Sequence, residues 1–208
     1  MFKGTPELIG KRREEIVNAC ERLYQTMGFR EITLKDIGNA TAFSRPTIYN
    51  YFHSKEEIFL ALYKREYDRW NEALEAIWAS EAVCSKAELA DRIAASLSDR
   101  AQLLKLLSMN NYDMEANSRP ELLTEFKVSY GASMRNVRRI LTKFCPDMDA
   151  GEIQNFIYVF FPFMFGIYPY TAVTDKQKTA MREAGIDFAY QSIYEITRSF
   201  LHTLLGIR

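Results

Sequence analysis

Residues 33–55 read TLKDIGNATAFSRPTIYNYFHSK, and this stretch predicts two short helices joined by a tight turn. The first helix begins after Thr33, whose hydroxyl can cap it while Asp36 stands three residues further on, in the spacing of a capping box. The second helix begins after Ser44, and Pro46 stands early in it, where its missing N–H costs little. The stretch is therefore typical of a helix-turn-helix.

Each of the two predicted helices has an apolar side and a polar side. The apolar residues are expected to pack on the helix that precedes them in the chain, and they are Leu34, Ile37, Ala40, Phe43 and Ile48. The second helix then points a different set of side chains outward, namely Arg45, Thr47, Tyr49 and Asn50. A recognition helix presents its N-terminal residues to the major groove of DNA in this way.

The outward side chains have the chemistry that base recognition requires. Arg45 can bind guanine through two hydrogen bonds, and Asn50 can bind adenine. Thr47 or Pro46 can contact a thymine methyl group. For Tyr49, packing in the core is an equal alternative to DNA contact, and for Arg45 and Asn50 the alternative is plain exposure to solvent. We expect a double-stranded DNA operator as the partner.

Another set of residues is placed for contacts with the DNA backbone. Thr33, Tyr51 and Lys55 lie at the starts or edges of helices, where phosphate contacts would set the register of the protein on DNA. His53 lies beside Lys55 and can also touch phosphate. The whole chain has a net charge of zero, but residues 1–55 carry nine Lys and Arg against six Asp and Glu. This end of the chain is therefore modestly positive.

Three segments of this region resemble the TetR family of bacterial repressors. Asp36-Ile37-Gly38 is followed by Ser44-Arg45-Pro46-Thr47-Ile48-Tyr49-Asn50-Tyr51-Phe52 and then by Ser54-Lys55-Glu56-Glu57. The family shows an Asp-Ile-Ala run, then Ser-x-x-Thr-Leu/Ile-Tyr-x-Tyr/His-Phe, and then Ser/Asn-Lys-Glu-Glu at the start of the next helix. The resemblance covers about residues 10–65, and the rest of the chain is similar to the family in length and helix content.

Two positions depart from the family pattern. Gly38 stands where Ala is usual, and it should loosen the short helix by roughly 1 kcal/mol. Ala42 occupies a turn position that is commonly Gly, and it should cost about another 1 kcal/mol if that turn requires a left-handed residue. Neither departure removes a group that would contact DNA.

The resemblance implies an all-α protein with two parts. These are an N-terminal three-helix helix-turn-helix domain for DNA binding, at residues 1–55, and a C-terminal helical domain for ligand binding and dimerisation, at residues 56–208. Family members are usually homodimers joined by their last two long helices, and each C-terminal domain encloses a ligand cavity. Ligand entry shifts the fourth helix and releases the operator. A repressor is the expected activity, although the residues alone leave an activator open.

Helices are predicted throughout the chain. The first begins near Thr5-Pro6, the fourth opens at Ser54, and Asp149 caps a later helix over residues 150–170. The last is predicted from Gly185 to Leu205.

An uncharged run extends from Ile153 to Thr174 and has the length of a membrane span. It contains Pro162 and Pro169, however, and no basic cluster follows it of the kind that orients a span. A helix buried in a core or in a dimer interface is the better interpretation. We therefore expect this helix, kinked at Pro162, to pair with the last helix in a homodimer.

The effector is expected to be a small apolar or aromatic molecule, although the sequence does not identify it. Aromatic and methionine side chains suit such a molecule in an adaptable cavity. The candidate lining residues are Leu103, Leu107, Met114, Phe126, Tyr130, Met134, Phe160, Met164 and Tyr168. Ordinary core packing is the alternative for this set, and it is the commoner meaning of such a stripe. The polar stretch Asn110–Glu115 could orient a ligand or simply connect two helices.

Other classes of protein are disfavoured. Cys20, Cys84 and Cys145 lie far apart, and neither His53 nor His202 has partners at metal-ligand spacing. No motif combines a nucleophile with a base, and no Gly-rich phosphate loop occurs. We expect no catalytic residue, no metal and no cofactor, and, because no apolar signal segment opens the chain, a cytoplasmic protein. A DNA-binding regulator without an inducer and an all-helical enzyme remain the alternatives.

Overall fold

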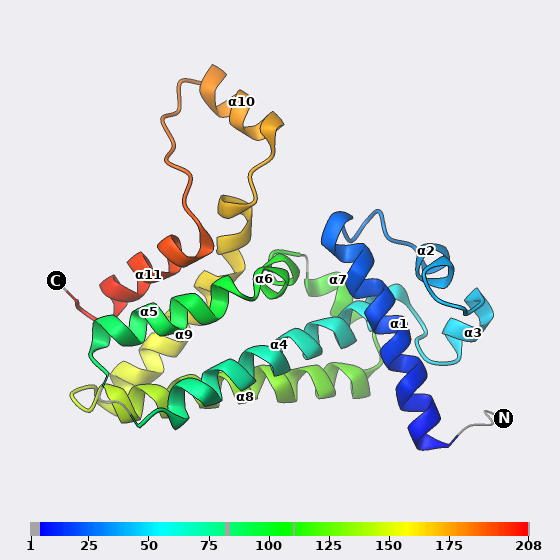
Figure 1. Cartoon of the computed structure of the whole chain (residues 1–208), viewed down its shortest axis with the longest axis horizontal. Coiled ribbons are helices and arrows are strands. Elements are labelled where there is room, and N and C mark those ends of the chain that lie inside the picture. The colour runs from blue at the N-terminus through cyan, green and yellow to red at the C-terminus, as the bar shows by residue number, and fades with distance from the viewer. Residues whose placement is uncertain (1–4, 82–83, 110, 208) are drawn as a thin grey trace. The chain divides into compact units, whose positions relative to one another are not determined.

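The computed structural model describes residues 5–81, 84–109 and 111–207, and every regular element within these ranges is a helix (Figure 1). The prediction of an all-α protein is confirmed. Asn110, part of the polar stretch considered for ligand orientation, lies outside the described residues. The helices are α1 (Pro6–Thr26), α2 (Leu34–Asn39), α3 (Arg45–Tyr49), α4 (Lys55–Ala79), α5 (Lys86–Ser98), α6 (Ala101–Leu107), α7 (Asn111–Ala116), α8 (Pro120–Phe144), α9 (Ala150–Thr171), α10 (Asp175–Glu183) and α11 (Ile193–Leu204).

The chain divides into two compact units. The first comprises the residues up to Glu66 together with Met109–Tyr130, and the second comprises Tyr67–Ser108 together with the residues from Gly131 onward. The division therefore falls inside α4 and inside α8. The functional domains predicted at residues 1–55 and 56–208 stay a prediction.

Side-chain caps fix where the helices of the first unit begin. Thr33 and Asp36 form the predicted capping box of α2: Thr33 N donates to Asp36 Oδ2 at 2.9 Å, and Asp36 N donates to Thr33 Oγ1 at 3.2 Å. Ser44 Oγ accepts from Thr47 N at 3.3 Å and caps α3, as predicted. The predicted starts of α1 and α4 are confirmed as well.

The core of the first unit holds α1, α2 and α3 in place. Ile37 of α2 and Ile48 of α3 are fully buried, as predicted, and α2 packs on both α1 and α3. The Phe59 ring of α4 meets the rings of Tyr24 and Phe29 edge-on, at centroid distances of 5.1 Å and 4.8 Å. Because a helix of five residues is not stable by itself, α3 takes its position from this core.

The turn between α2 and α3 is not strained. Within the described residues, positive φ angles occur only at Gly185 and Gly206, so the turn does not require a left-handed residue at Ala42. The cost considered for Ala42 therefore does not arise. Gly38 has a reason to be glycine, because a Cβ there would lie 3.0 Å from the carbonyl oxygen of Phe43. Glycine at position 38 lowers the helix propensity of α2, but it allows α2 to lie close to the turn.

The second unit is organised around Trp70 of α4. The Trp70 ring is fully buried and lies 6.4 Å and 6.0 Å, between ring centroids, from Phe160 and Phe161 of α9. Its indole N–H donates to Ser96 Oγ of α5 at 3.1 Å, which satisfies the buried polar group. Helices α5 and α9 both pack on α11, and α6 packs on α9. Helix α9 begins where it was predicted and continues past Pro162.

The prediction of a last helix starting at Gly185 is wrong at its beginning. Gly185 adopts a φ of +68°, which ends the preceding helical turn and suits only glycine. Helix α11 starts eight residues later, at Ile193, because Ser192 and Glu195 form a capping box there. Residues 185–192, included in the predicted helix, lie outside α11.

The segment between α9 and α11 contacts its unit through Phe188, whose ring lies 6.2 Å, between ring centroids, from that of Tyr170 at the end of α9. None of the residues of α10 is buried, and α10 projects away from α5, α9 and α11 in Figure 1. Among the described residues, no single helix has the length and hydropathy of a membrane span. Helices α9 and α10 reach these values only when taken together, across a bend of 85°.

Candidate DNA-binding site

Helix α3 has one side in the core and the other toward solvent. Ile48 is completely buried, and it fixes which side of the helix faces inward. The opposite side, including the C-cap position, is exposed or half-buried and carries the five predicted base-reading residues Arg45, Pro46, Thr47, Tyr49 and Asn50. The structure thus brings together the residues that the sequence singled out. Their contact with DNA stays a prediction.

Arg45 and Tyr49 form a pair on the exposed surface of α3. Arg45 Nη2 donates to the Tyr49 hydroxyl at 3.0 Å, and the guanidinium carbon lies 5.5 Å from the centre of the Tyr49 ring. The two residues are one helical turn apart, so they lie on the same side of the helix. Tyr49 is 39% exposed, so its ring does not lie in the core, which was the alternative that the sequence left open. The pair presents a positive, planar group that can bind a base edge.

Tyr51 is placed differently from the rest of the predicted set. Its side chain is buried, its ring lies 6.5 Å from that of Phe43, and its hydroxyl accepts from Arg12 Nη1 of α1 at 3.1 Å. The structure therefore places the Tyr51 side chain in the core of the unit, away from the exposed side of α3. The burial of Tyr51 could not be predicted from the sequence, because residues just past the end of a helix do not follow the helical periodicity.

The other predicted backbone contacts differ in exposure. Thr33 and His53 are exposed. Lys55 is half-buried: its ammonium group donates to the Phe29 carbonyl at 2.7 Å and lies 4.1 Å from the centre of the Phe29 ring. A phosphate would have to compete with these contacts for Lys55. Lys35, which had been counted only toward the charge of this region, is exposed on α2 and is a further candidate for a phosphate contact.

Two family models together match almost the whole chain. Residues 16–62 match the model described as bacterial regulatory proteins of the tetR family, and residues 64–206 match that of the tetracyclin repressor-like C-terminal domain. The chain belongs to the TetR family of transcriptional regulators. The resemblance of its helix-turn-helix to this family is thereby confirmed. The family is one of regulators, and not of enzymes.

Two curated relatives are transcriptional regulators of the helix-turn-helix type. The chain is 28% identical over 158 residues to the uncharacterised transcriptional regulator YfiR of Bacillus subtilis, and the match covers 73% of each chain. It is 41% identical over 51 residues to the transcriptional regulator EthR of Mycolicibacterium smegmatis, a match covering 24% of each chain.

Solved structures of other regulators share the fold. A transcriptional regulator from Rhodococcus sp. RHA1 matches with a TM-score of 0.66 at 18% identity, covering 94% of this chain and 95% of that one. The fatty acid degradation regulator FadR of Bacillus halodurans matches with a TM-score of 0.60 at 15% identity, over 100% and 99% of the two chains. FadR of Bacillus subtilis, solved with stearoyl-CoA, gives 0.61 at 17% identity, over 94% and 99%.

The predicted ligand-lining residues are divided between the two units. Met114, Phe126 and Tyr130 belong to the first unit, and the other six belong to the second. Six of the nine are buried, and the half-buried ones are Tyr130, Met134 and Tyr168. Phe126 stacks with Tyr130 at 6.4 Å between ring centroids, and burial raises the pKa of the Tyr130 hydroxyl. Burial fits core packing as well as a cavity lining, so the ligand-binding role of these residues stays a prediction.

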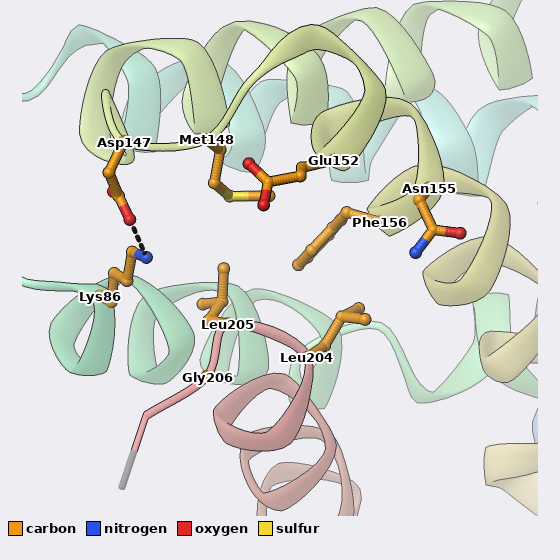
Figure 2. A pocket seen from close by; sticks show the side chains of 9 residues that line it. All are labelled: Lys86, Asp147, Met148, Glu152, Asn155, Phe156, Leu204, Leu205 and Gly206. Atoms are coloured by element: carbon orange, nitrogen blue, oxygen red, sulfur yellow. Dashed lines mark hydrogen bonds and ion pairs between the residues drawn. The ribbon is translucent and has the colours of Figure 1, made fainter.

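A hollow of about 310 Å³ lies in the second unit, between the starts of α5 and α9 and the end of α11. Figure 2 shows the side chains that line it. Lys86 Nζ donates to Asp147 Oδ2 at 2.6 Å on one side of it, and Glu152 belongs to the capping box of α9. Apolar side chains, among them Phe156 and Leu204, line much of the rest. The hollow contains none of the predicted lining residues. Because its charged groups are already engaged with protein groups, we assign no ligand to it.

The cysteines lie in the core of the described part of the chain. Cys20, Cys84 and Cys145 are free and buried. Burial raises the pKa of the Cys145 thiol to about 11 and that of Cys20 further still, so neither forms a thiolate near neutral pH. Within the described residues, no group of three His, Cys, Asp or Glu side chains could hold a metal ion.

The different positions of Tyr49 and Tyr51 lead to opposite expectations for their alanine variants. Tyr51→Ala should lower the free energy of unfolding by about 3 kcal/mol, because it empties a buried site. Tyr49→Ala should lower it by less than about 1 kcal/mol, because the ring is largely on the surface. Urea unfolding of both variants at one protein concentration checks this. Equal losses of stability would contradict the burial of Tyr51.

Proposed function

We propose that this TetR-family chain is a ligand-responsive repressor. It binds a near-palindromic operator as a homodimer, through α3 in the major groove, and a small apolar or aromatic molecule releases it. The observation that carries the proposal is the exposed side of α3, where Arg45 and Asn50 lie on a helix whose other side is held in the core by Ile48. Plain exposure to solvent stays the alternative for these two side chains, and DNA binding by variants at these positions distinguishes the two.

The proposed dimer uses α9 and α11. Helix α9 buries one side in its own unit and leaves Tyr158, Val159, Phe165 and Tyr170 exposed on the other, which is unusual for large apolar residues in a monomer. Phe163 stacks face to face on Phe200 of α11, with ring centroids 3.7 Å apart, so the two helices lie side by side. Two such pairs from two subunits would form a four-helix interface. A fixed dimer is what spaces two recognition helices about 34 Å apart.

The proposed effector is apolar because the candidate lining residues are apolar. Stearoyl-CoA, named with FadR of Bacillus subtilis, has an apolar acyl chain on a charged CoA group, and it is a reasonable first compound to test, together with smaller aromatic molecules. An effector must bind the DNA-free form more tightly than the DNA-bound form, and the ratio of the two affinities sets how far it can release the operator. If none of these compounds changes operator affinity, the chain is a regulator that acts without such an inducer.

Arg45→Ala tests base recognition directly. We expect specific DNA binding to weaken by about 1–3 kcal/mol and the preference at one base pair to relax, because a bidentate contact is lost. The measurement is fluorescence anisotropy with duplexes selected from random sequence and with a scrambled duplex. Arg182→Ala, on exposed α10 of the other unit, removes the same charge and is the matched control. Equal behaviour of the two variants would mean that α3 is not the recognition helix.

Phe165→Glu and Phe160→Glu separate the interface of the proposed dimer from the core of the subunit. Phe165 is 37% exposed and Phe160 is fully buried, although both are on α9. A buried carboxylate without a partner is costly, so Phe160→Glu should unfold the chain, whereas Phe165→Glu should give a folded monomer. Sedimentation velocity and circular dichroism measure both outcomes. An unchanged dimer in Phe165→Glu would place the interface elsewhere.

A further inference from the structure

The corner between α7 and α8, residues 117–119, is tied to the turn that follows α3. Ser54 Oγ donates to the Asn117 carbonyl at 2.8 Å. The main chain and the side chain of Arg119 both donate to Glu57, 62 residues away at the start of α4, which follows that turn. Both segments belong to the first unit. These contacts therefore join a part of the chain outside the helix-turn-helix to the end of the candidate recognition helix.

Glu57 is the centre of this connection. Its side chain is only 1% exposed, and its Oε1 accepts from Arg119 N at 3.1 Å and from Arg119 Nε at 2.7 Å. Its Oε2 accepts from Arg119 Nη2 at 2.8 Å and from His53 N at 2.7 Å. Burial acts to raise the pKa of Glu57, but the hydrogen bonds from Arg119 and His53 outweigh it and hold the pKa below its usual range. The carboxylate is therefore charged and compensated at neutral pH.

Arg119 also contacts the backbone next to α3. Arg119 Nη2 donates to the Tyr51 carbonyl at 3.3 Å. The amides of Tyr51 and Phe52 in turn donate to the carbonyl of Ile48, at 2.9 Å and 3.0 Å. One guanidinium thus connects the buried Glu57, at the start of α4, with the last turn of α3. A displacement of Arg119 would be felt first at the end of that helix.

The segment that carries Arg119 also carries two of the candidate ligand-lining residues. Met114 of α7 and Phe126 of α8 lie on either side of Arg119 in the chain, and both are buried in the first unit. The Phe126 ring lies 4.8 Å, between ring centroids, from that of Tyr63 on α4. A molecule that displaced Met114 or Phe126 would move the segment to which Arg119 belongs. The chain thus has a short physical path from these side chains to α3.

We infer that Arg119 is a positioning residue, which couples the α7–α8 corner to the recognition helix through Glu57 and the Tyr51 carbonyl. The inference rests on the proposed function, because that proposal makes α3 the recognition helix. The new element is Arg119, through which the rest of the first unit would control the position of α3. Coupling of this kind is reciprocal: what changes the corner changes α3, and DNA bound at α3 changes the corner.

Hydrogen exchange of the full chain tests the coupling without a known operator or effector. In Arg119→Gln, the amides of Tyr51, Phe52 and His53 should exchange about tenfold faster than in the wild type, because the contacts that hold this turn are lost. Lys127→Gln is the matched control, since Lys127 pairs with Glu115 on the same segment at 3.3 Å and does not touch the turn. It should leave those amides unchanged.

Two further measurements keep the result decisive. If Arg119→Gln does not fold, Arg119→Lys retains a positive charge for Glu57 but not the planar fork, and it should show the same faster exchange. In the wild type, a duplex selected from random sequence should also slow exchange at the Arg119 amide, and this effect should be absent in the folded variant. Exchange at residues 51–53 equal to that of Lys127→Gln would overturn the inference. Failure of the wild type to select any duplex would count against the proposed function, while the comparison of exchange rates would still decide the coupling.

Discussion

A helix of five residues cannot persist by itself in water, and α3 therefore depends on what holds it from outside. The Ser44 cap supplies its first hydrogen bond, and the burial of Ile48 sets its orientation. The same orientation turns Arg45 and Asn50 toward solvent, so stability and DNA recognition are served by opposite sides of one short element. Tyr51, whose side chain is buried, and Arg119, which binds its carbonyl, fix the far end of this helix. The recognition surface is thus only as well defined as these supports.

Helix α9 of the second unit also has two sides with different roles. Its inner residues pack on Trp70, while its outer residues are apolar without being covered by their own unit. This explains why the run from Ile153 to Thr174 contains no charge. A membrane span and a dimer interface both leave such a run in a sequence, and the burial of one side of α9 favours the interface.

Much of the fold could be predicted because capping residues close in the sequence determine where several helices begin. Thr33 and Ser44 each cap a helix by accepting a hydrogen bond from the amide three residues later, and the prediction of both caps is confirmed. The predicted start at Gly185 is wrong because apolar residues continue on both sides of it, whereas the capping box of Ser192 and Glu195 sets the start of α11. The exposed residues of the candidate site followed from periodicity, but the burial of Tyr51 depends on tertiary packing. The partnership of Arg119 with Glu57 spans 62 residues, and no local pattern indicates it.

The central claim is that two copies of α3 occupy neighbouring major grooves of one operator. Hydroxyl-radical footprinting of the purified protein on a duplex selected from random sequence, at low and moderate salt, tests it most directly. The account predicts two protected blocks on a near-palindrome, about one helical turn apart or a multiple of that, and an affinity that falls steeply as salt rises. A folded dimer that protects no specific sequence, or that protects a single block, would contradict it.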